Sequence, residues 1–362
     1  MLALKPDYGD RKSPSGNPIR VMLVDDSVVA RSIFERILSG SQQIEIVCQA
    51  ENPDIAIDLL ARHKVDIILL DIEMPRRSGL DALPDLLQKS SGARILVVSS
   101  FAEENGPGAI QALSLGACDT LGKPGRSGFT GRFSQTLLEK VIHLGNSERS
   151  NDIAVAEVPT VQPQSKVELK MPDCIAIGAS TGGIPAIYDV IANLKPDIDC
   201  PIFITQHLPH TFMSFFAKQL GSQTDRIVCV AEPGMAAKKN HIYIAPGEAH
   251  LICRKSGRDV VMDHFEDQET TRYCPSVDIM FASLAQVYGD GVIAVVLSGM
   301  GSDGTIGAEK LSDSGSHILA QDAASSVVWG MPGNISRLGL ASGVMPPAAI
   351  GKMISNASGG VG

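Results

Sequence analysis

A serine stands in a turn between a buried strand and a helix, within residues 174–185. Gly178, Ser180 and Gly182 fit the pattern Gly-x-Ser-x-Gly, in which glycines permit a tight strand-to-helix turn and the hydroxyl is exposed above a sheet. A hydroxyl in this place is typical of a nucleophile. The alternative is that Ser180 and Thr181 only cap the helix that follows, so the choice depends on whether the chain supplies a base and a carboxylate.

A histidine and an aspartate follow two other apolar strands. His207 comes directly after the run 201–206, and Asp303 lies in the glycine-rich turn after the run 292–297. Open α/β sheets form their sites beyond the carboxyl ends of the strands, where these side chains would meet Ser180. A serine becomes nucleophilic when an imidazole takes its proton, and a carboxylate fixes the imidazole tautomer. The three residues are therefore candidates for a nucleophile, its base and an orienting carboxylate in one site.

Other interpretations of the same segments stay open. Taken alone, His207 is compatible with the role of a core or capping histidine, and with His210 it forms a His-x-x-His pair that suggests zinc. No third ligand stands at metal spacing nearby, and a proline lies between the two histidines. The run 299–304 matches the dinucleotide pattern Gly-x-Gly-x-x-Gly, with Asp322 ending the next strand. Too few residues follow to complete such a domain, and Asp303 would place a carboxylate against the pyrophosphate.

Three carboxylates mark a second possible site. Asp25 and Asp26 end the first strand of the chain, and Asp71 ends the third. These strand ends are neighbours at the switch point of a parallel sheet. Carboxylates that converge repel one another unless a hard cation neutralises them, and Mg²⁺ prefers such oxygen ligands. The cluster predicts a magnesium site, in which one aspartate could also accept a phosphoryl group; a helix cap is the alternative for each aspartate alone.

Apolar runs of strand length alternate with amphipathic helical segments throughout the chain. The first part contains five such runs, at 20–25, 44–48, 66–71, 94–99 and 118–121, and its last helix reaches about Ile142. The second part begins near Pro172 and alternates in the same way. Near-continuous apolar strands that alternate with helices predict α/β domains, a five-stranded parallel sheet in the first and a doubly wound, mostly parallel sheet in the second.

Polar segments set the expected boundaries. Residues 1–18 contain Pro, Gly, Ser and mixed charge and predict a disordered tail. Residues 145–171 are rich in Asn, Ser, Glu, Pro and Gln, and Pro159 and Pro163 argue against a helix, so we expect an extended linker. The domains are then 19–144 and 172–362.

Composition limits the function classes. The net charge of −9 argues against a nucleic-acid-binding output, which usually needs a basic face. No apolar run approaches the length that spans a bilayer, and the N-terminus lacks an apolar signal segment. The seven cysteines are scattered and never in Cys-x-x-Cys spacing, which favours free thiols in a reducing compartment. We therefore expect a cytoplasmic protein that binds no nucleic acid and inserts no segment into the membrane.

With Met74-Pro75, Ser99 and Lys123-Pro124, the three aspartates resemble the receiver domain of two-component response regulators, a flavodoxin-like fold, over residues 19 to about 143. The resemblance implies that Asp71 is the phosphoacceptor and that Asp25, Asp26 and Asp71 bind Mg²⁺. It implies that Ser99 and Lys123 contact the phosphoryl group. It further implies a histidine kinase as phosphodonor. Thr120 departs from the pattern, because receivers often carry an aromatic residue there.

The second domain closely resembles the catalytic domain of bacterial chemotaxis protein-glutamate methylesterases. The runs that carry the resemblance are 178–183 (GASTGG), 205–209 (TQHLP), 243–247 (YIAPG), 275–278 (PSVD) and 298–304 (SGMGSDG). The resemblance implies Ser180 as nucleophile, His207 as base, Asp303 as its orienter, Thr181 as a neighbour in the site and the Met300 backbone as an oxyanion donor. Cys274 stands where that family often has a basic residue.

The resemblance also implies the reaction. It is hydrolysis of γ-methyl glutamate esters on chemoreceptor helical bundles, with release of methanol, and deamidation of some receptor glutamines. Ester hydrolysis would need no cofactor. Two other classes remain: a phosphorylation-controlled binding module without turnover, and an oxidoreductase that binds a dinucleotide at 299–304. A hydrolysis assay distinguishes all three.

Overall fold

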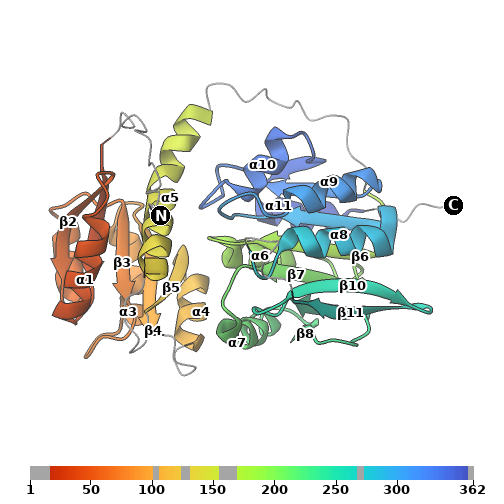
Figure 1. The fold of residues 1–362 in the computed structure, drawn as a ribbon, viewed down its shortest axis with the longest axis horizontal. Helices are drawn as coiled ribbons and strands as arrows, with labels where there is room; N and C mark the ends of the chain where they lie inside the picture. The colour runs from red at the N-terminus through yellow and green to blue at the C-terminus, as the bar shows by residue number, and fades with distance from the viewer. Residues whose placement is uncertain (1–16, 101–105, 124–130, 155–168, 267–272, 358–362) are drawn as a thin grey trace, which may run out of the picture.

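The computed structural model describes residues 17–100, 106–123, 131–154, 169–266 and 273–357. It contains two layered α/β units, one from each half of the chain, which lie side by side (Figure 1). We call them the receiver unit, residues 17–154, and the catalytic unit, residues 169–357. Each has a parallel sheet with helices on both faces, as the sequence predicts.

The receiver unit has a five-stranded parallel sheet in the order β2-β1-β3-β4-β5. Its strands are β1 (Ile19–Val24), β2 (Ile44–Ala50), β3 (Ile67–Asp71), β4 (Arg94–Ser100) and β5 (Asp119–Lys123). Its helices are α1 (Val28–Leu38), α2 (Pro53–Leu60), α3 (Gly79–Lys89), α4 (Gly106–Ser114) and α5 (Gly131–Ala154). Side-chain oxygens of Ser27, Asn52 and Ser78 accept bonds from backbone N–H groups of the first turns of α1, α2 and α3, which fixes where these helices begin.

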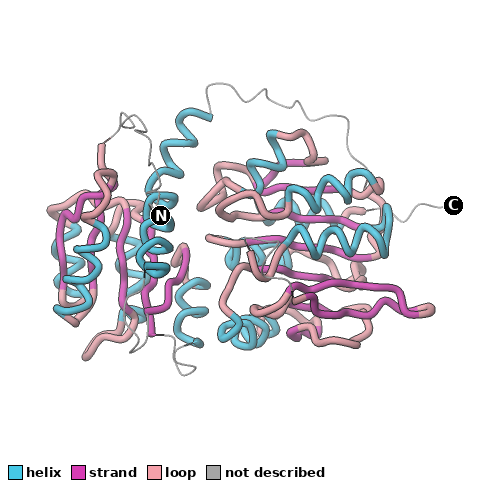
Figure 2. The backbone as a smooth tube through the Cα atoms, in the orientation of Figure 1, coloured by secondary structure: helices cyan, strands magenta, loops and turns pink. Residues whose placement is uncertain are grey.

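The catalytic unit has a seven-stranded sheet in the order β14-β13-β12-β6-β7-β9-β8, with parallel pairing throughout. Its strands are β6 (Cys174–Ala179), β7 (Ile202–Gln206), β8 (Ile227–Val230), β9 (His241–Ile244), β12 (Val292–Val296), β13 (His317–Gln321) and β14 (Gly343–Met345). An antiparallel hairpin of β10 (His250–Ser256) and β11 (Asp259–Phe265) extends from the side of this unit (Figure 2).

The central strands β6, β7 and β12 are completely buried, because helices cover both faces of the sheet. The helices are α6 (Gly183–Ala192), α7 (His210–Gly221), α8 (Val277–Tyr288), α9 (Thr305–Asp313), α10 (Met331–Arg337) and α11 (Pro347–Ser355), with a 3₁₀ helix at Gly289–Gly291. The long apolar runs of the sequence thus become the middle of the sheet, where the candidate site lies.

One boundary differs from the sequence prediction. Helix α5 continues to Ala154 rather than ending near Ile142, so the first part of the predicted 145–171 linker is helical. At the other end of that segment, Leu169 is buried in an apolar cluster. Polar composition concealed the helix because its last turns need no apolar face. Residues 155–168 and most of the predicted 1–18 tail lie outside the described residues.

The two units share an apolar contact. One cluster joins the α3/α4 side of the receiver sheet to the β6/β7 side of the catalytic sheet, and α4 packs on α6 and α7. Ser114 of α4 bonds the Gln219 amide of α7 at 2.7 Å and the Tyr188 hydroxyl of α6 at 3.4 Å. The receiver unit is therefore docked against the catalytic unit in this structure (Figure 1).

All seven cysteines are free thiols, as their scatter in the sequence predicts. Within the described part of the chain, no helix is both long enough and apolar enough to cross a membrane.

Candidate active site

Strand pairing brings the serine and the histidine together. Ala179 at the end of β6 pairs with Gln206 at the end of β7, and Ser180 and His207 are the residues that follow them. The His207 backbone N–H donates to Ala179 O at 3.1 Å, and the Gln206 amide donates to Ser180 O at 2.9 Å. Because these residues leave adjacent strands at the same edge, their side chains are presented to one space.

The serine turn is shaped by close packing rather than by helix capping. Gly182 is the N-cap of α6, has φ 75° and receives no side-chain bond, so neither Ser180 nor Thr181 caps the helix. A Cβ at Gly182 would collide with Val327 and with the Ser298 hydroxyl, which explains the glycine. The capping interpretation of Ser180 is therefore wrong.

Asp303 holds the His207 ring. Its Oδ2 lies 2.7 Å from His207 Nε2, and its side chain is almost fully buried. Burial by itself would raise the pKa of Asp303, but the bond to His207, the charge of that ring and backbone N–H donors outweigh it and lower the pKa. The carboxylate is therefore ionised beside the imidazole, as an orienting group must be.

The segment 275–278 donates three hydrogen bonds to the Asp303 carboxylate. The Ser276 hydroxyl donates to Oδ1 at 2.9 Å, Val277 N–H donates to Oδ2 at 2.7 Å, and Asp278 N–H donates to Oδ1 at 3.0 Å. Sequence analysis did not assign these contacts. Ser276 is the N-cap of α8, and the sequence signal that could have indicated these contacts is that a capping hydroxyl and the N–H groups of a first helical turn can also receive a nearby carboxylate.

The His207 ring uses Nε2 for Asp303, which leaves Nδ1 as the nitrogen available to the serine. Among the described residues no hydrogen bond joins the Ser180 hydroxyl to this ring, and such bonds often tighten only when substrate is present. Strand β12, which pairs with β6, borders the candidate site on the other side of the serine. The Ser180 N–H donates to Ser298 O at 3.0 Å, just beyond the end of β12. Gly299 lies against Ser180, where a Cβ would be 3.0 Å from that of the serine.

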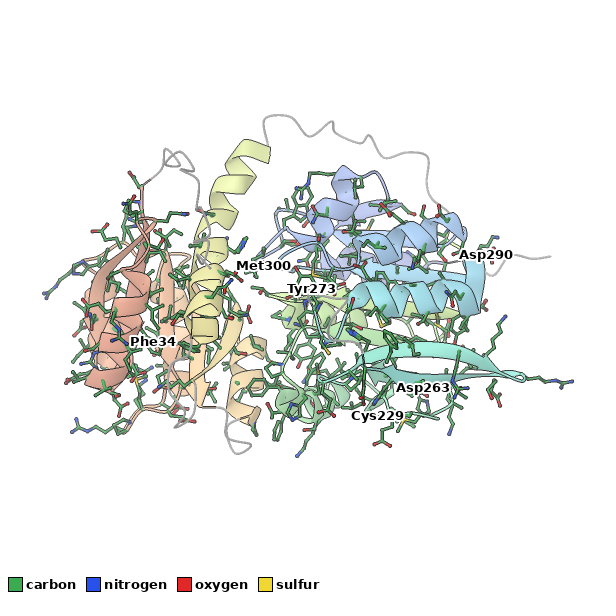
Figure 3. All side chains as sticks on the ribbon, viewed as in Figure 1. Phe34, Cys229, Asp263, Tyr273, Asp290 and Met300 are labelled. Atoms are coloured by element: carbon green, nitrogen blue, oxygen red, sulfur yellow. The ribbon has the colours of Figure 1, made fainter. Side chains whose placement is uncertain are left out.

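Met300 follows in the same turn. Its backbone N–H donates to no carbonyl or side chain in the part of the chain that the structure describes. A free amide next to the residue that touches Ser180 suits an oxyanion that forms there. The Met300 side chain packs on the apolar cluster of the receiver unit and is labelled in Figure 3 on the side that faces that unit.

The three aspartates of the receiver unit also come together. Oxygens of Asp25, Asp26 and Asp71 lie within 4.8 Å of one another, with Asp26 exposed and the other two buried. The Lys123 ammonium lies 2.8 Å from Asp25 Oδ2 and 2.6 Å from Asp71 Oδ2. Burial raises the pKa of Asp71 to about 6 against the opposing effect of Lys123. Three oxygen ligands with an exposed opening fit Mg²⁺.

Ser99 stands at the same edge of the receiver sheet. It pairs with Gly122 at the end of β5 and is 1% exposed. The sequence-predicted residues of the receiver site therefore all lie at the carboxyl ends of β1, β3, β4 and β5.

A receiver carboxylate reaches the serine turn. Asp119 Oδ2 accepts bonds from the Thr181 hydroxyl and from the Lys140 ammonium, both at 2.5 Å. Gly182 N–H, the first donor of α6, bonds Cys118 O at 2.8 Å. The docked receiver unit thus occupies polar groups of the turn that presents Ser180.

Comparison with known proteins identifies both parts of the chain. Residues 175–354 match the family model "CheB methylesterase", and residues 21–128 match "Response regulator receiver domain". A protein-glutamate methylesterase/protein-glutamine glutaminase of Rhodospirillum rubrum is 36% identical, with 91% of this chain and 93% of that protein covered. One from Caulobacter vibrioides is 38% identical, with 93% and 98% covered.

The chain belongs to this methylesterase/glutaminase family. The predicted order of a receiver and an esterase is confirmed. Among solved structures, the Thermotoga maritima CheB methylesterase catalytic domain is 35% identical, covers 50% of this chain and 96% of its own, and has a TM-score of 0.48.

Thr120 and Cys274, at which the sequence departs from the expected pattern, both lie close in sequence to residues that contact the candidate site. Thr120 is buried on β5, next to the Asp119 that bonds the serine turn. Cys274 is half-buried in the segment that leads to the Asp303 contacts. His210 begins α7 and is not part of the carboxylate cluster, which is the one potential metal-ligand group in the described residues.

Proposed function

We propose that this chain hydrolyses γ-methyl esters of glutamate on chemoreceptor helical bundles and deamidates some receptor glutamines. The observation that carries the proposal is the bond of His207 Nε2 to buried Asp303, at the strand edge that also presents Ser180. The curated relatives, which carry both activities in their names, support it.

In this mechanism, the Ser180 hydroxyl oxygen attacks the ester carbonyl while its proton passes to His207 Nδ1. The carbonyl oxygen becomes an oxyanion and accepts the Met300 N–H, and Asp303 stabilises the imidazolium. The imidazolium then protonates the leaving methoxide, so methanol departs and an acyl-serine remains. Water attacks this ester with His207 as base, which releases the glutamate carboxylate and restores Ser180. Thr181 neighbours the reacting serine.

The receiver unit supplies the control. Asp71 accepts a phosphoryl group from a chemotaxis histidine kinase, and Ser99 and Lys123 contact that group. Asp25, Asp26 and Asp71 hold Mg²⁺, which when bound neutralises charge on the phosphoryl oxygens. The ester site uses neither Mg²⁺ nor another cofactor. Since the kinase and the receptor helices lie in the cytoplasm, the protein acts there, without nucleic acid or membrane insertion.

The division of labour follows the two units: the receiver domain begins at about residue 19 and includes helix α5 to Ala154, and the esterase domain spans residues 172–362. The unphosphorylated receiver covers the serine turn through Asp119 and Cys118. Phosphorylation of Asp71 repacks the receiver and weakens this contact, which exposes the site to receptor helices. A differential stability of a few kcal/mol between docked and released states is sufficient.

Methanol release from methylated receptor membranes tests the proposal. The parent chain should release methanol, and Ser180→Ala and His207→Ala should each lower kcat by about 10⁶-fold because the triad acts as a unit. The double variant should be little worse than either single one. Substantial turnover by folded Ser180→Ala would remove the triad, and an inactive parent chain would leave a phosphorylation-controlled binding module instead.

A further inference from the structure

The ring of Tyr273 lies flat on the ring of His207. The ring centroids are 4.9 Å apart and the planes differ by 8°. Tyr273 lies outside the proposed triad, and no motif in the sequence marks it. We propose that Tyr273 is a positioning residue for the methylesterase: its ring holds the His207 imidazole against Asp303 and stabilises the imidazolium that forms when His207 takes the serine proton. The inference rests on the proposed triad.

The stacking favours one protonation state over the other. The face of a phenol ring carries partial negative charge, so it attracts a cation within about 6 Å of its centroid more strongly than a neutral ring. In the proposed reaction His207 becomes cationic with its ring centroid 4.9 Å from that of Tyr273. An interaction that is stronger in the transition state than in the ground state raises kcat rather than substrate affinity.

Tyr273 also connects the base to the oxyanion turn. A Cβ at Gly301, which has φ 86°, would collide with the Tyr273 hydroxyl oxygen, so that oxygen lies directly over the residue after Met300. Figure 3 labels Tyr273 and Met300 near each other on the side that faces the receiver unit. One side chain therefore contacts the base with its ring and the oxyanion turn with its hydroxyl end.

The segment that carries Tyr273 also reaches the third member of the triad. Ser276, Val277 and Asp278, a few residues further on, donate the three bonds to Asp303 described above. The ring of Tyr273 and the carboxylate of Asp303 thus contact His207 from two sides. The segment 273–278 supplies the ring itself and the donors that hold the carboxylate. Sliding or rotation of the imidazole would break the Nε2 bond or lose the stacking.

The charged and titratable groups around the imidazole limit how a pH effect is interpreted. Asp303 bonds Nε2, Asp278 lies half-buried beside Asp303, and Tyr273 covers one ring face. Burial raises the pKa of Asp278 to about 6, so this carboxyl titrates near the range of interest. An Asp278→Asn background therefore belongs in the experiment, because it removes the neighbouring titration while Tyr273 stays.

The chain offers a matched control. His241 and Tyr243 on β9 form a second stacked pair, with centroids 5.7 Å apart and planes 16° apart. The Tyr243 hydroxyl accepts Lys238 N–H and donates to Ala236 O, away from the triad. Tyr243→Phe removes a hydroxyl from a stacked tyrosine that the proposal gives no role in catalysis.

The test is the pH dependence of methanol release by the full-length chain. Tyr273→Leu should lower kcat by about three- to thirty-fold, the range of a cation–π contact, and change KM less. It should also move the acidic limb of the kcat profile to lower pH, in the parent and in the Asp278→Asn background. Tyr273→Phe should retain most of kcat and the position of the limb, and Tyr243→Phe should change neither.

A second substitution keeps the inference testable if Tyr273→Leu does not fold. Pentafluorophenylalanine at position 273 keeps the shape of Phe but removes negative charge from the ring face, so it should reproduce the lower kcat and the shifted limb relative to Tyr273→Phe. Unchanged pH profiles for both variants, or a change confined to KM, would overturn the role of the ring. An equal kcat loss in Tyr273→Phe would assign the effect to the hydroxyl on Gly301 and likewise overturn it.

Ser180→Ala in the same assay separates this inference from the function on which it rests. If Ser180→Ala abolishes turnover while the Tyr273 variants leave the profile unchanged, the triad stands and the stacking role is wrong. If Ser180→Ala retains turnover, the triad itself is wrong, and the positioning role falls with it.

Discussion

Asp71 and Asp303 are 3% and 2% exposed, each at the carboxyl edge of a parallel sheet, and their pKa values move in opposite directions. Burial raises the pKa of Asp71 to about 6, since Lys123 and the Glu73 N–H compensate only part of its effect. Burial also acts on Asp303, but His207, the Ser276 hydroxyl and three backbone N–H groups stabilise the carboxylate and lower its pKa.

The difference matches the two roles that we propose for these aspartates in one architecture. An orienting carboxylate must stay ionised through every step, so it is surrounded by donors of its own chain. A phosphoacceptor that needs a cation is left short of donors, because the cation supplies the missing charge. The number of hydrogen bonds from the protein, rather than burial, therefore separates the two sites.

The largest expected effect comes from neutralising Asp303. Asp303→Asn should lower kcat on the order of 10⁴-fold, because the amide favours the wrong tautomer of His207 while the reacting groups remain. Stopped assays of methanol release would measure it, with circular dichroism as the check on folding. A loss below about tenfold would mean that Asp303 is not the orienting group, and the comparison with Asp71 would lose its meaning.

Asp71→Asn should change the response to phosphorylation and leave unstimulated turnover unchanged, whereas Asp303→Asn should lower turnover itself. The Asp71 substitution removes the proposed phosphoacceptor, so a small-molecule phosphodonor with Mg²⁺ should no longer raise methanol release, while unstimulated turnover stays unchanged. A chelator added to the parent chain should give the same pair of results, because the proposal places Mg²⁺ at the receiver site alone. Loss of unstimulated turnover with chelator, restored by Mg²⁺, would place the metal at the ester site.

The sequence predicted these sites from position along strands. Ser180, His207 and Asp303 could be placed because each follows an apolar run, and strand ends of a parallel sheet share one edge. Asp25, Asp26 and Asp71 followed by the same argument, and the alternation of strands and helices predicted both folds.

Contacts between segments without such a marker could not be predicted. Tyr273 reaches His207 from a loop, and Asp119 reaches Thr181 from the other unit. Neither contact is indicated by a pattern of residue types or spacings in the sequence, because each depends on how loops or whole units pack. The helical turns up to Ala154 were missed for a related reason: they carry polar residues without an apolar period.

The raised pKa of Asp71 also predicts a dependence of stability on pH. A carboxyl with a folded-state pKa of about 6, against 3.8 for an unperturbed side chain, binds its proton more tightly in the folded state. The stabilisation is complete below about pH 4 and is lost as the pH rises through 6. In metal-free buffer, Asp71→Asn should therefore be more stable than the parent, and the difference in the free energy of unfolding should grow by up to about 3 kcal/mol between pH 4 and pH 7. The difference in Tm should grow with it.

The control for that measurement is Asp26→Asn, which neutralises the exposed neighbour in the same cluster. Calorimetry at several pH values should show a smaller change for this variant. An Asp71→Asn advantage that is flat with pH would mean that Lys123 keeps Asp71 ionised throughout, and then the two buried aspartates would not differ as described.

The smallest expected effect concerns Asp119, the carboxylate that joins the two regions. In Asp119→Asn the bond from Thr181 becomes one between neutral groups and Lys140 loses its partner, so the docked state should be weakened by about 1 kcal/mol. Unstimulated methanol release should then rise about three- to tenfold, and the further gain from phosphodonor should shrink by the same factor.

Asp66→Asn is the matched control, because Asp66 pairs with Arg20 at the start of the receiver sheet and not with the catalytic unit. It should leave unstimulated turnover unchanged. If Asp119→Asn lowers turnover instead, the receiver activates the serine turn through Thr181 rather than covering it.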